Sequence, residues 1–388
     1  MKALTLAMLT ERLVLGLCAP LAVGCGSSSN GGRNDGSGGR TASEAGTSNG
    51  GLPTGTAGAA GSSGSDQGGG QANGGGSGST SAPVQDHALA ATDASACALD
   101  ASGKIQCWGF APNTWTIPDG TFVELHASLS SFCAVRADRT VTCFDPPSGN
   151  STSIANMMPM GKVQLIELGL GTICGVDDTD APFCKSDYPG LSVPDGESFS
   201  QYSIGYEFAC GIRKADGSIA CWGNGGDAAC SLSIPAVGQL VPPSGAFVRV
   251  SSGVYSSCAL DAAGALSCWG AGKSGDDSAA ACAGHRYNFG QSVSPSGAFR
   301  AVAVGQNHSC GIKTGGALAC WGAGTADSDC PGDSVDCRQS RPPAGSFVQV
   351  SVGRVHSCAM TAERKVQCWG YPGAGAGDGR LVPPAEFQ

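Results

Sequence analysis

The feature that most constrains this chain is a series of seven cysteine pairs, six separated by ten positions and one by eleven. The pairs are Cys97/Cys107, Cys133/Cys143, Cys174/Cys184, Cys210/Cys221, Cys258/Cys268, Cys310/Cys320 and Cys358/Cys368. In the clearest unit, Cys258 and Cys268 flank the turn Asp261–Gly264. With Ala263 at the centre of that turn, the two cysteines face each other across a hairpin, where Cα atoms lie about 4.5–5.5 Å apart. That separation suits a disulfide, so each pair is predicted to staple one β-hairpin.

A zinc site is the alternative explanation of paired cysteines. Zinc needs four converging ligands, usually cysteines two residues apart or cysteines combined with histidines. Neither spacing occurs here. The pair Cys210/Cys221 also fits a hairpin, because its additional residue falls in the turn Arg213–Gly217. The cysteines therefore predict disulfides and no metal or other cofactor.

A proline, a turn and then an aromatic residue precede most of the hairpins. This marker occurs at Pro118–Phe122, Pro194–Phe199, Pro243–Phe247, Pro295–Phe299 and Pro343–Phe347, and in reduced form at Pro159–Val163. Successive first cysteines lie 36 to 52 residues apart, the range of propeller blades. The chain ends on a seventh marker, Pro384–Phe387, which begins an eighth unit, whereas the first unit, from about Ala88, lacks a marker. The two ends are therefore expected to complete one blade and close a ring, which removes exposed sheet edges.

Two further markers recur in register with the cysteines. A Gly-x-x-His-Ser segment precedes the cysteine in Gly305–Cys310 and Gly353–Cys358, and a Trp-Gly dipeptide begins at 108, 222, 269, 321 and 369. With an initial alternating strand and an apolar hairpin, these features resemble the repeats of the regulator of chromosome condensation family over about residues 87–388. The second and third units depart from the pattern, with Phe144-Asp145 and Lys185-Ser186 in place of Trp-Gly.

This resemblance implies an all-β, seven-bladed β-propeller, here with one disulfide within each blade. The founder of the family acts on a small GTPase bound to chromatin. The cysteine staples and the formal charge of −9 argue against that role for this chain. Phosphate binding needs clustered Lys and Arg, so no nucleic-acid partner is predicted. The protein is expected to be a monomer.

The N-terminus has the pattern of an export signal. Residues 1–24 contain an apolar run of twelve residues that ends at Cys25, too short to span a bilayer and typical of a signal peptide. The small residues Ala22–Gly24 resemble a bacterial lipobox, so residues 1–24 are predicted to be a lipoprotein signal peptide and Cys25 its lipidation site. An ordinary signal peptide cut elsewhere is the alternative. A translation start at Met8 would leave Arg12 as the positive region.

Residues 25–86 consist almost entirely of Gly, Ser, Asn, Thr and Ala. Such a composition cannot bury enough apolar area to offset the entropy of ordering. It predicts a disordered tether reaching about 40–50 Å. Because 20 cysteines are incompatible with a reducing cytosol, residues 87–388 are expected to be extracytoplasmic, lipid-anchored to a bacterial membrane. The outer membrane or cell surface is favoured, and the leaflet stays open.

Three insertions follow the closing dipeptides of blades four, five and six: 227–240, 274–290 and 325–340. Because they leave equivalent positions of neighbouring blades, they are expected to emerge on one face. They contain the four other extracytoplasmic cysteines, Cys230, Cys282, Cys330 and Cys337. Cys330–Cys337 could close one loop and Cys230–Cys282 could join two blades, although other pairings are open.

The insertion of the fifth blade mixes charge with aromatic residues, as protein-contacting patches do. The candidate binding loop comprises Asp276, Asp277, His285, Arg286, Tyr287 and Phe289. A solvated loop without a partner is the alternative. The sixth-blade insertion offers weak calcium candidates, Asp327, Asp329, Asp333 and Asp336, whose spacing follows no known calcium loop.

No catalytic constellation is visible. His308 and His356 occupy a repeat position that predicts a structural role, and His87, His126 and His285 have no recognisable catalytic partners. Neither a His-Glu-x-x-His nor a Gly-x-Ser-x-Gly motif occurs. The recurring tryptophans are predicted to pack the blades rather than to stack on carbohydrate.

The sequence thus predicts a membrane-tethered extracytoplasmic module that binds a protein or a surface glycan through loops on one propeller face. It is not predicted to be an enzyme. One alternative is a propeller enzyme that acts on glycans or cell-wall material with two acidic residues in the central channel. Another is a passive envelope protein with no saturable ligand.

Overall fold

The structure is a computed structural model that describes residues 87–110, 115–145, 154, 161–187, 190–224, 238–272, 289–325, 337–373 and 379–388. The chain divides into two units, Met1–Gly75 and Gly76–Gln388, and every described residue belongs to the second. The predicted leader, Cys25 and the tether lie outside the described residues. In the part of the chain that is described, no helix is long and apolar enough to cross a membrane.

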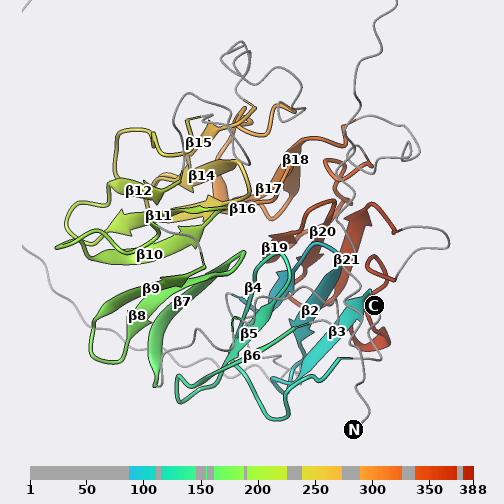
Figure 1. The fold of residues 1–388 in the computed structure, drawn as a ribbon. Helices are drawn as coiled ribbons and strands as arrows, with labels where there is room; N and C mark the ends of the chain where they lie inside the picture. The colour runs from blue at the N-terminus through green and yellow to red at the C-terminus, as the bar shows by residue number, and fades with distance from the viewer. Residues whose placement is uncertain are drawn as a thin grey trace, which may run out of the picture. The chain divides into compact units, whose positions relative to one another are not determined.

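Regular structure in the described residues is almost entirely β, in seven antiparallel sheets of three strands (Figure 1). The first four blades are β1 Leu89–Ala91, β2 Ser95–Leu99, β3 Ile105–Gly109; β4 Glu124–Ala127, β5 Phe132–Val135, β6 Val141–Phe144; β7 Val163–Gly169, β8 Thr172–Asp177, β9 Pro182–Ser186; and β10 Phe199–Ile204, β11 Phe208–Arg213, β12 Ile219–Gly223. The last three are β13 Arg249–Ser252, β14 Ser256–Leu260, β15 Leu266–Gly270; β16 Phe299–Val304, β17 His308–Lys313, β18 Leu318–Gly322; and β19 Gln349–Val352, β20 His356–Met360, β21 Val366–Gly370. A short 3₁₀ turn, η4 Ala385–Phe387, lies at the C-terminus.

All seven predicted disulfides are present, one in each blade, and each joins the middle strand to the third strand at directly paired positions. The bonds are Cys97–Cys107, Cys133–Cys143, Cys174–Cys184, Cys210–Cys221, Cys258–Cys268, Cys310–Cys320 and Cys358–Cys368. The bridged Cα atoms lie 4.0 to 4.1 Å apart, slightly closer than the expected separation. The predicted disulfide within each hairpin is therefore confirmed.

The two halves of each staple differ in burial, which the spacing did not predict. The middle-strand cysteine of every blade is fully buried. Its partner on the third strand is only partly buried, which holds for Cys107, Cys143, Cys184, Cys221, Cys268, Cys320 and Cys368. The third strand is the outermost of each three-stranded sheet, so its side chains have fewer neighbours. Each staple thus fastens an outer strand to the core of its blade.

The first strands of the blades form the inner wall of a closed ring. Each inner strand contacts the inner strand of the next blade, and β19 contacts β1. Side chains join the strands across the blade boundaries: Ser251 Oγ accepts from Val304 N at 3.1 Å, and Ser351 Oγ accepts from Ala91 N at 2.9 Å. The second of these bonds links the last blade to the first. The predicted seven-bladed β-propeller is confirmed.

The C-terminal segment completes the first blade, as the unfinished eighth unit predicted. The ring of Phe387 is 1% exposed and packs in the cluster of the first and last blades, which includes Met360 and Val366. Its centroid lies 6.1 Å from that of Trp108. Phe387 therefore supplies to blade one the aromatic residue that the proline marker supplies to the other blades.

The proline markers also fasten neighbouring blades. The amide of the marker phenylalanine donates to the carbonyl of a hairpin-turn glycine in the preceding blade, as Phe299 N does to Gly264 O at 2.8 Å and Phe347 N to Gly316 O at 2.9 Å. Gly264 has a φ of +81°, and a Cβ there would lie 2.5 Å from Phe299 O. Only glycine permits this close approach without strain.

Candidate functional site

One residue from each inner strand lines a cavity of about 250 Å³ along the ring axis. This residue pairs with the first cysteine of its blade. The set comprises Ala90, His126, Glu167, Ser203, Ser251, Ala303 and Ser351. Five of the seven are alanine or serine, so the fold itself requires only a small side chain at this position. The His126 and Glu167 side chains give the cavity its chemical asymmetry.

His126, on β4, lies buried between two carboxylates. Its Nδ1 is 3.7 Å from Glu167 Oε2 on β7, and its Nε2 is 3.4 Å from Glu124 Oε2 on β4. The guanidinium of Arg139 donates to the other oxygen of Glu124, which anchors that carboxylate from outside the cavity. Both nitrogens of the buried imidazole are thus paired with acidic oxygens.

The charges around His126 shift the pKa values of His126 and Glu124 away from their usual values. Burial by itself lowers the pKa of His126, but the hydrogen bonds and charges of Glu124 and Glu167 outweigh burial and raise the pKa to about 9. Burial raises the pKa of Glu124, but the hydrogen bonds from His126 and Arg139 outweigh it and lower the pKa to about 2. At neutral pH, therefore, Glu124 is an ionised partner of two cations and has no proton to give as a general acid.

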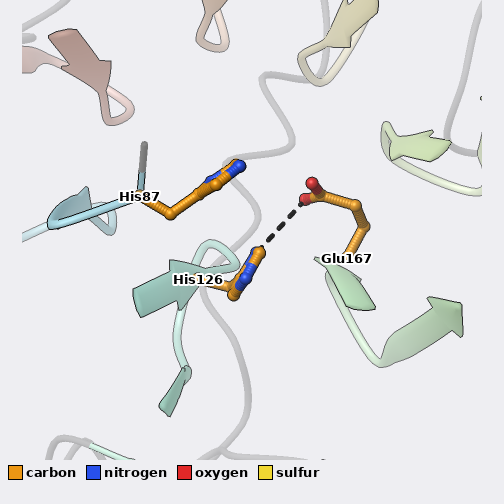
Figure 2. A group of neighbouring side chains, drawn as sticks. All are labelled: His87, His126 and Glu167. Carbon is orange, nitrogen blue, oxygen red and sulfur yellow. Dashed lines mark ion pairs between the residues drawn. The ribbon is translucent and has the colours of Figure 1, made fainter. Parts of the chain in front are cut away.

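His87, just before β1, lies beside His126 and Glu167, and these three residues are the cluster drawn in Figure 2. Its ring stacks on that of His126, with centroids 4.7 Å apart and an angle of 24° between the planes. The backbone of His87 has a φ of +70°, which is uncommon outside glycine. One ligand atom from each of His87, His126 and Glu167 lies within 4.8 Å of the others. Figure 2 shows the three side chains pointing toward one another from successive blades.

The sequence interpretation missed this cluster, because it found no catalytic partner for His87 or His126. The signal was present in the spacing. Glu167 lies seven residues before Cys174, and His126 lies seven residues before Cys133 (174 − 167 = 133 − 126 = 7). Aligning the blades on their first cysteines places both residues in the inner ring.

The three insertions leave from one face of the propeller. In each of the three blades the middle strand begins opposite the glycine that ends the third strand, as Ser256 pairs with Gly270 and His308 with Gly322. The turn between the first two strands lies at that same end of the sheet. We call this side the insert face. The hairpin turns, such as Asp261–Ala265, lie on the opposite side, the turn face.

Tryptophan side chains form hydrogen bonds with the backbone near the C-terminal ends of these insertions. Each donates its indole N–H to the backbone carbonyl of a glutamine within one or two residues of the end of the preceding blade's insertion. The pairs are Trp269 to Gln239 O at 2.9 Å, Trp321 to Gln291 O at 2.8 Å and Trp369 to Gln339 O at 2.9 Å, and Trp108 donates to Arg380 O at 3.1 Å across the ring closure. The Trp-Gly tryptophans are between 4% and 9% exposed, so they pack blades and offer no carbohydrate platform.

The stems of the fifth and sixth insertions are built alike. Gln291 Oε1 accepts from Phe289 N at 2.9 Å, and Gln339 Oε1 accepts from Cys337 N. A Cβ on Gly272 would lie 2.1 Å from Gln291 Oε1, so the outgoing strand passes directly over the buried amide. The insertions are therefore mounted on rigid bases.

The predicted site residues can be placed only in part. Of the candidate binding loop, Phe289 is described and half-buried at the stem, whereas Asp276, Asp277, His285, Arg286 and Tyr287 lie outside the described residues. The same holds for Asp327, Asp329, Asp333 and Asp336, and for Cys230, Cys282 and Cys330. Cys337 is buried.

The repeat histidines have the structural surroundings that were predicted. His308 and His356 are both fully buried. His308 Nε2 lies 2.8 Å from Ser357 Oγ of the next blade. Burial lowers the pKa of His308 to about 3, with His356 adding to the effect. A neutral core imidazole is the result.

Comparison with known proteins agrees with this architecture. Residues 347–376, which contain all three strands of the last blade, match the sequence model of the regulator of chromosome condensation (RCC1) repeat. The CRINKLY WD40 ectodomain of the Arabidopsis thaliana receptor kinase ACR4 is similar with a TM-score of 0.54 and 18% identity, over 76% of this chain and 98% of that chain. The entire ectodomain of the Physcomitrella patens receptor kinase CR4 gives the same score and identity, over 73% of each chain.

Prp20p from Saccharomyces cerevisiae, whose binding to Gsp1p and histones has been described, is similar with a TM-score of 0.47 and 15% identity, over 67% of this chain and 76% of that chain. At such identities a structural likeness shows the fold alone. The resemblance predicted from the sequence is thus confirmed: the chain carries a repeat of the regulator of chromosome condensation type on a seven-bladed β-propeller.

Proposed function

We propose that this protein is an extracytoplasmic protein-binding module, tethered to a bacterial membrane through Cys25, whose insert face contacts the partner. The observation that carries the proposal is the common origin of the three insertions. They leave equivalent ends of blades four, five and six, and the last two rest on the same buried glutamine stem. Variable loops on a rigid scaffold are the usual location of binding residues.

The centre of the insert face favours a protein over a glycan. Leu129 and Tyr206, from the inner turns of blades two and four, pack with Val254 of blade five beside a hollow of about 90 Å³. An apolar centre with a polar rim is the anatomy of a protein interface. The tryptophans that would stack on sugars are buried. A surface glycan is therefore the second choice of ligand.

Rigidity also supports a binding role. A disulfide in every blade holds the base of the loops in place before a partner arrives. So does the hydrogen bond from a tryptophan indole N–H to a backbone carbonyl at each insertion stem, here called a latch. Anchored stems reduce the entropy that is lost when loop residues are fixed on association. Seven disulfides require an oxidising compartment, which agrees with an extracytoplasmic location.

Capture from native envelope material tests the interface. The bait is the full chain with residues 274–288 replaced by a short Gly-Ser linker, compared with the unaltered chain. The matched control carries Ala262→Lys and Ala263→Lys, two exposed positions in the hairpin turn of the same blade but on the turn face. We expect saturable capture of one protein that is lost with the linker variant and kept by the control. Equal capture by all three baits would refute the assignment of the face.

Residues Tyr287 and Phe289 refine that test. Replacing both with serine is expected to abolish partner binding, because aromatic anchors dominate most interfaces. Retained affinity would exclude this loop as the contact and leave the other two insertions.

The anchor has an independent test. Cells expressing the full chain are grown with an alkyne-bearing fatty acid, and the protein is probed for the label. We expect labelled, membrane-associated protein that becomes unlabelled and soluble when Cys25 is replaced by alanine. Label that persists in the Cys25→Ala variant would contradict the lipidation site and the tether role proposed for residues 25–86.

A propeller enzyme of the kind considered from the sequence would carry two acidic residues in the central channel. Glu167 is the acidic residue that lines the cavity in the described part of the chain. Glu124 is held by His126 and Arg139.

A further inference from the structure

The cluster on the inner wall of blades one to three has the composition of a metal centre. We propose that His87, His126 and Glu167 bind a divalent transition-metal ion of the zinc type. This inference is independent of the proposed binding function. Two imidazoles and one carboxylate are a recurrent zinc ligand set, which leaves a fourth position for water. Imidazole donors favour this class of ion over calcium or magnesium.

The distances require only small movements. In a tetrahedral zinc site the ligand atoms lie about 3.4 Å apart, since each bond is about 2.0–2.1 Å. His126 Nδ1 and Glu167 Oε2 are already 3.7 Å apart. The whole set lies within 4.8 Å, so the largest approach needed is about 1.4 Å. His87 is exposed and Glu167 is partly exposed, and both side chains can turn while His126 stays fixed.

The surroundings of His126 have the form that a metal ligand needs. A ligating histidine almost always donates its other ring N–H to a carboxylate, a backbone carbonyl or water, which fixes the tautomer and the ring orientation. Here Nδ1 faces Glu167 and the cavity, where a bound ion would replace the proton on Nδ1. Nε2 keeps its proton and faces Glu124 at 3.4 Å. Arg139 in turn holds Glu124. This carboxylate–histidine pair with its own anchor is the supporting layer of a metal site.

The propeller does not need these residues for its architecture. At the same ring position the other five blades carry alanine or serine. The histidine and the glutamate sit on neighbouring blades, beside a His87 whose backbone is in the left-handed region. Uncommon backbone conformations cluster at ligand-binding sites. Two departures from the repeat, His126 and Glu167, thus lie beside a third ligand-bearing residue with an uncommon backbone conformation.

Metal binding by the full, disulfide-intact chain tests the proposal. Zinc is removed with a chelator, and titration with Zn²⁺ is followed by calorimetry, with metal content measured after dialysis. We expect one equivalent. His87→Asn, chosen because asparagine tolerates a positive φ, and Glu167→Gln should each weaken binding at least about tenfold. Glu363→Gln is the matched control for Glu167→Gln, because it also removes one carboxylate, but from an exposed hairpin turn that does not line the cavity.

Two further readouts separate a metal site from a structural role. Glu124→Gln should weaken zinc binding by about 10- to 100-fold without changing the stoichiometry, as expected for a group that orients a ligand. Substitution with Co²⁺ should give the visible bands of a tetrahedral ion without the charge-transfer band of a thiolate, which excludes binding by cysteine. Less than one equivalent of zinc in the unaltered chain would overturn the proposal. So would equal affinity in the His87→Asn, Glu167→Gln and Glu363→Gln variants, with circular dichroism showing all three folded.

Discussion

Replacing Phe387 with alanine tests whether the chain closes into a ring. Phe387 is the penultimate residue, and an unattached terminus would tolerate its loss. In the structure its ring is 1% exposed and packs against residues of the first and last blades. Removing a fully buried phenylalanine costs about 3–5 kcal/mol, of which the ring contact with Trp108 contributes about 0.5–1.5 kcal/mol. We expect a loss of stability in that range.

Phe347 provides the matched control, because it occupies the same marker position at the last internal blade boundary. It is fully buried among residues of blades six and seven. If the terminal segment seals the ring, Phe387→Ala and Phe347→Ala should cost similar free energies. Both are measured by urea unfolding under non-reducing conditions, with fluorescence and circular dichroism as two probes of one transition. A cost below about 1 kcal/mol for Phe387→Ala alone, beside a full cost for Phe347→Ala, would refute closure through this segment.

Three further predictions concern the staples, the latches and a buried acid. Replacing Cys258 and Cys268 together with alanine should cost about 3 kcal/mol in urea unfolding, from the entropy of the short loop they close; no change would mean that the hairpin is already rigid without its staple. Trp321→Phe removes a buried donor and should cost about 1–3 kcal/mol. Trp222→Phe, whose indole N–H has no hydrogen-bond partner among the described residues, should cost less, and the reverse order would contradict the latch. Burial raises the pKa of Asp93 from its usual 3.8 to about 6, so its protonated form is favoured in the fold. The stability that protonated Asp93 contributes should therefore be fully present below about pH 4 and be lost as the pH rises to about 6. In the Asp93→Asn variant, the urea-unfolding midpoint should change less with pH across that window.

Much of the fold was predictable because its signals are local. The spacing of Cys258 and Cys268 is fixed by hairpin geometry, so each staple follows from the sequence around one turn. The marker ending in Phe387 repeats the internal markers, which revealed the closure. The role of the tryptophans was predicted as packing, but their partners were not. The carbonyl that Trp321 contacts lies 30 residues earlier, across a blade boundary.

The channel cluster could not be predicted by searching for motifs. His126 and Glu167 are 41 residues apart and lie on different blades (167 − 126 = 41). Alignment on the first cysteines places each side chain at the same inner-strand position of its own blade. The contact between β4 and β7 then makes the two positions neighbours. His87 precedes the first strand and belongs to no repeat, so its approach to His126 has no signal in the sequence. The loops expected to bind a partner remain predictions.

Site-specific photocrosslinking in living cells tests whether the insert face contacts a protein partner. A photoreactive amino acid is placed at Thr325, an exposed stem residue on the insert face, or at Ala263, an exposed residue on the turn face. We predict a discrete crosslinked species from Thr325 and none from Ala263. A species from Ala263 alone, or none from either position, would contradict the account.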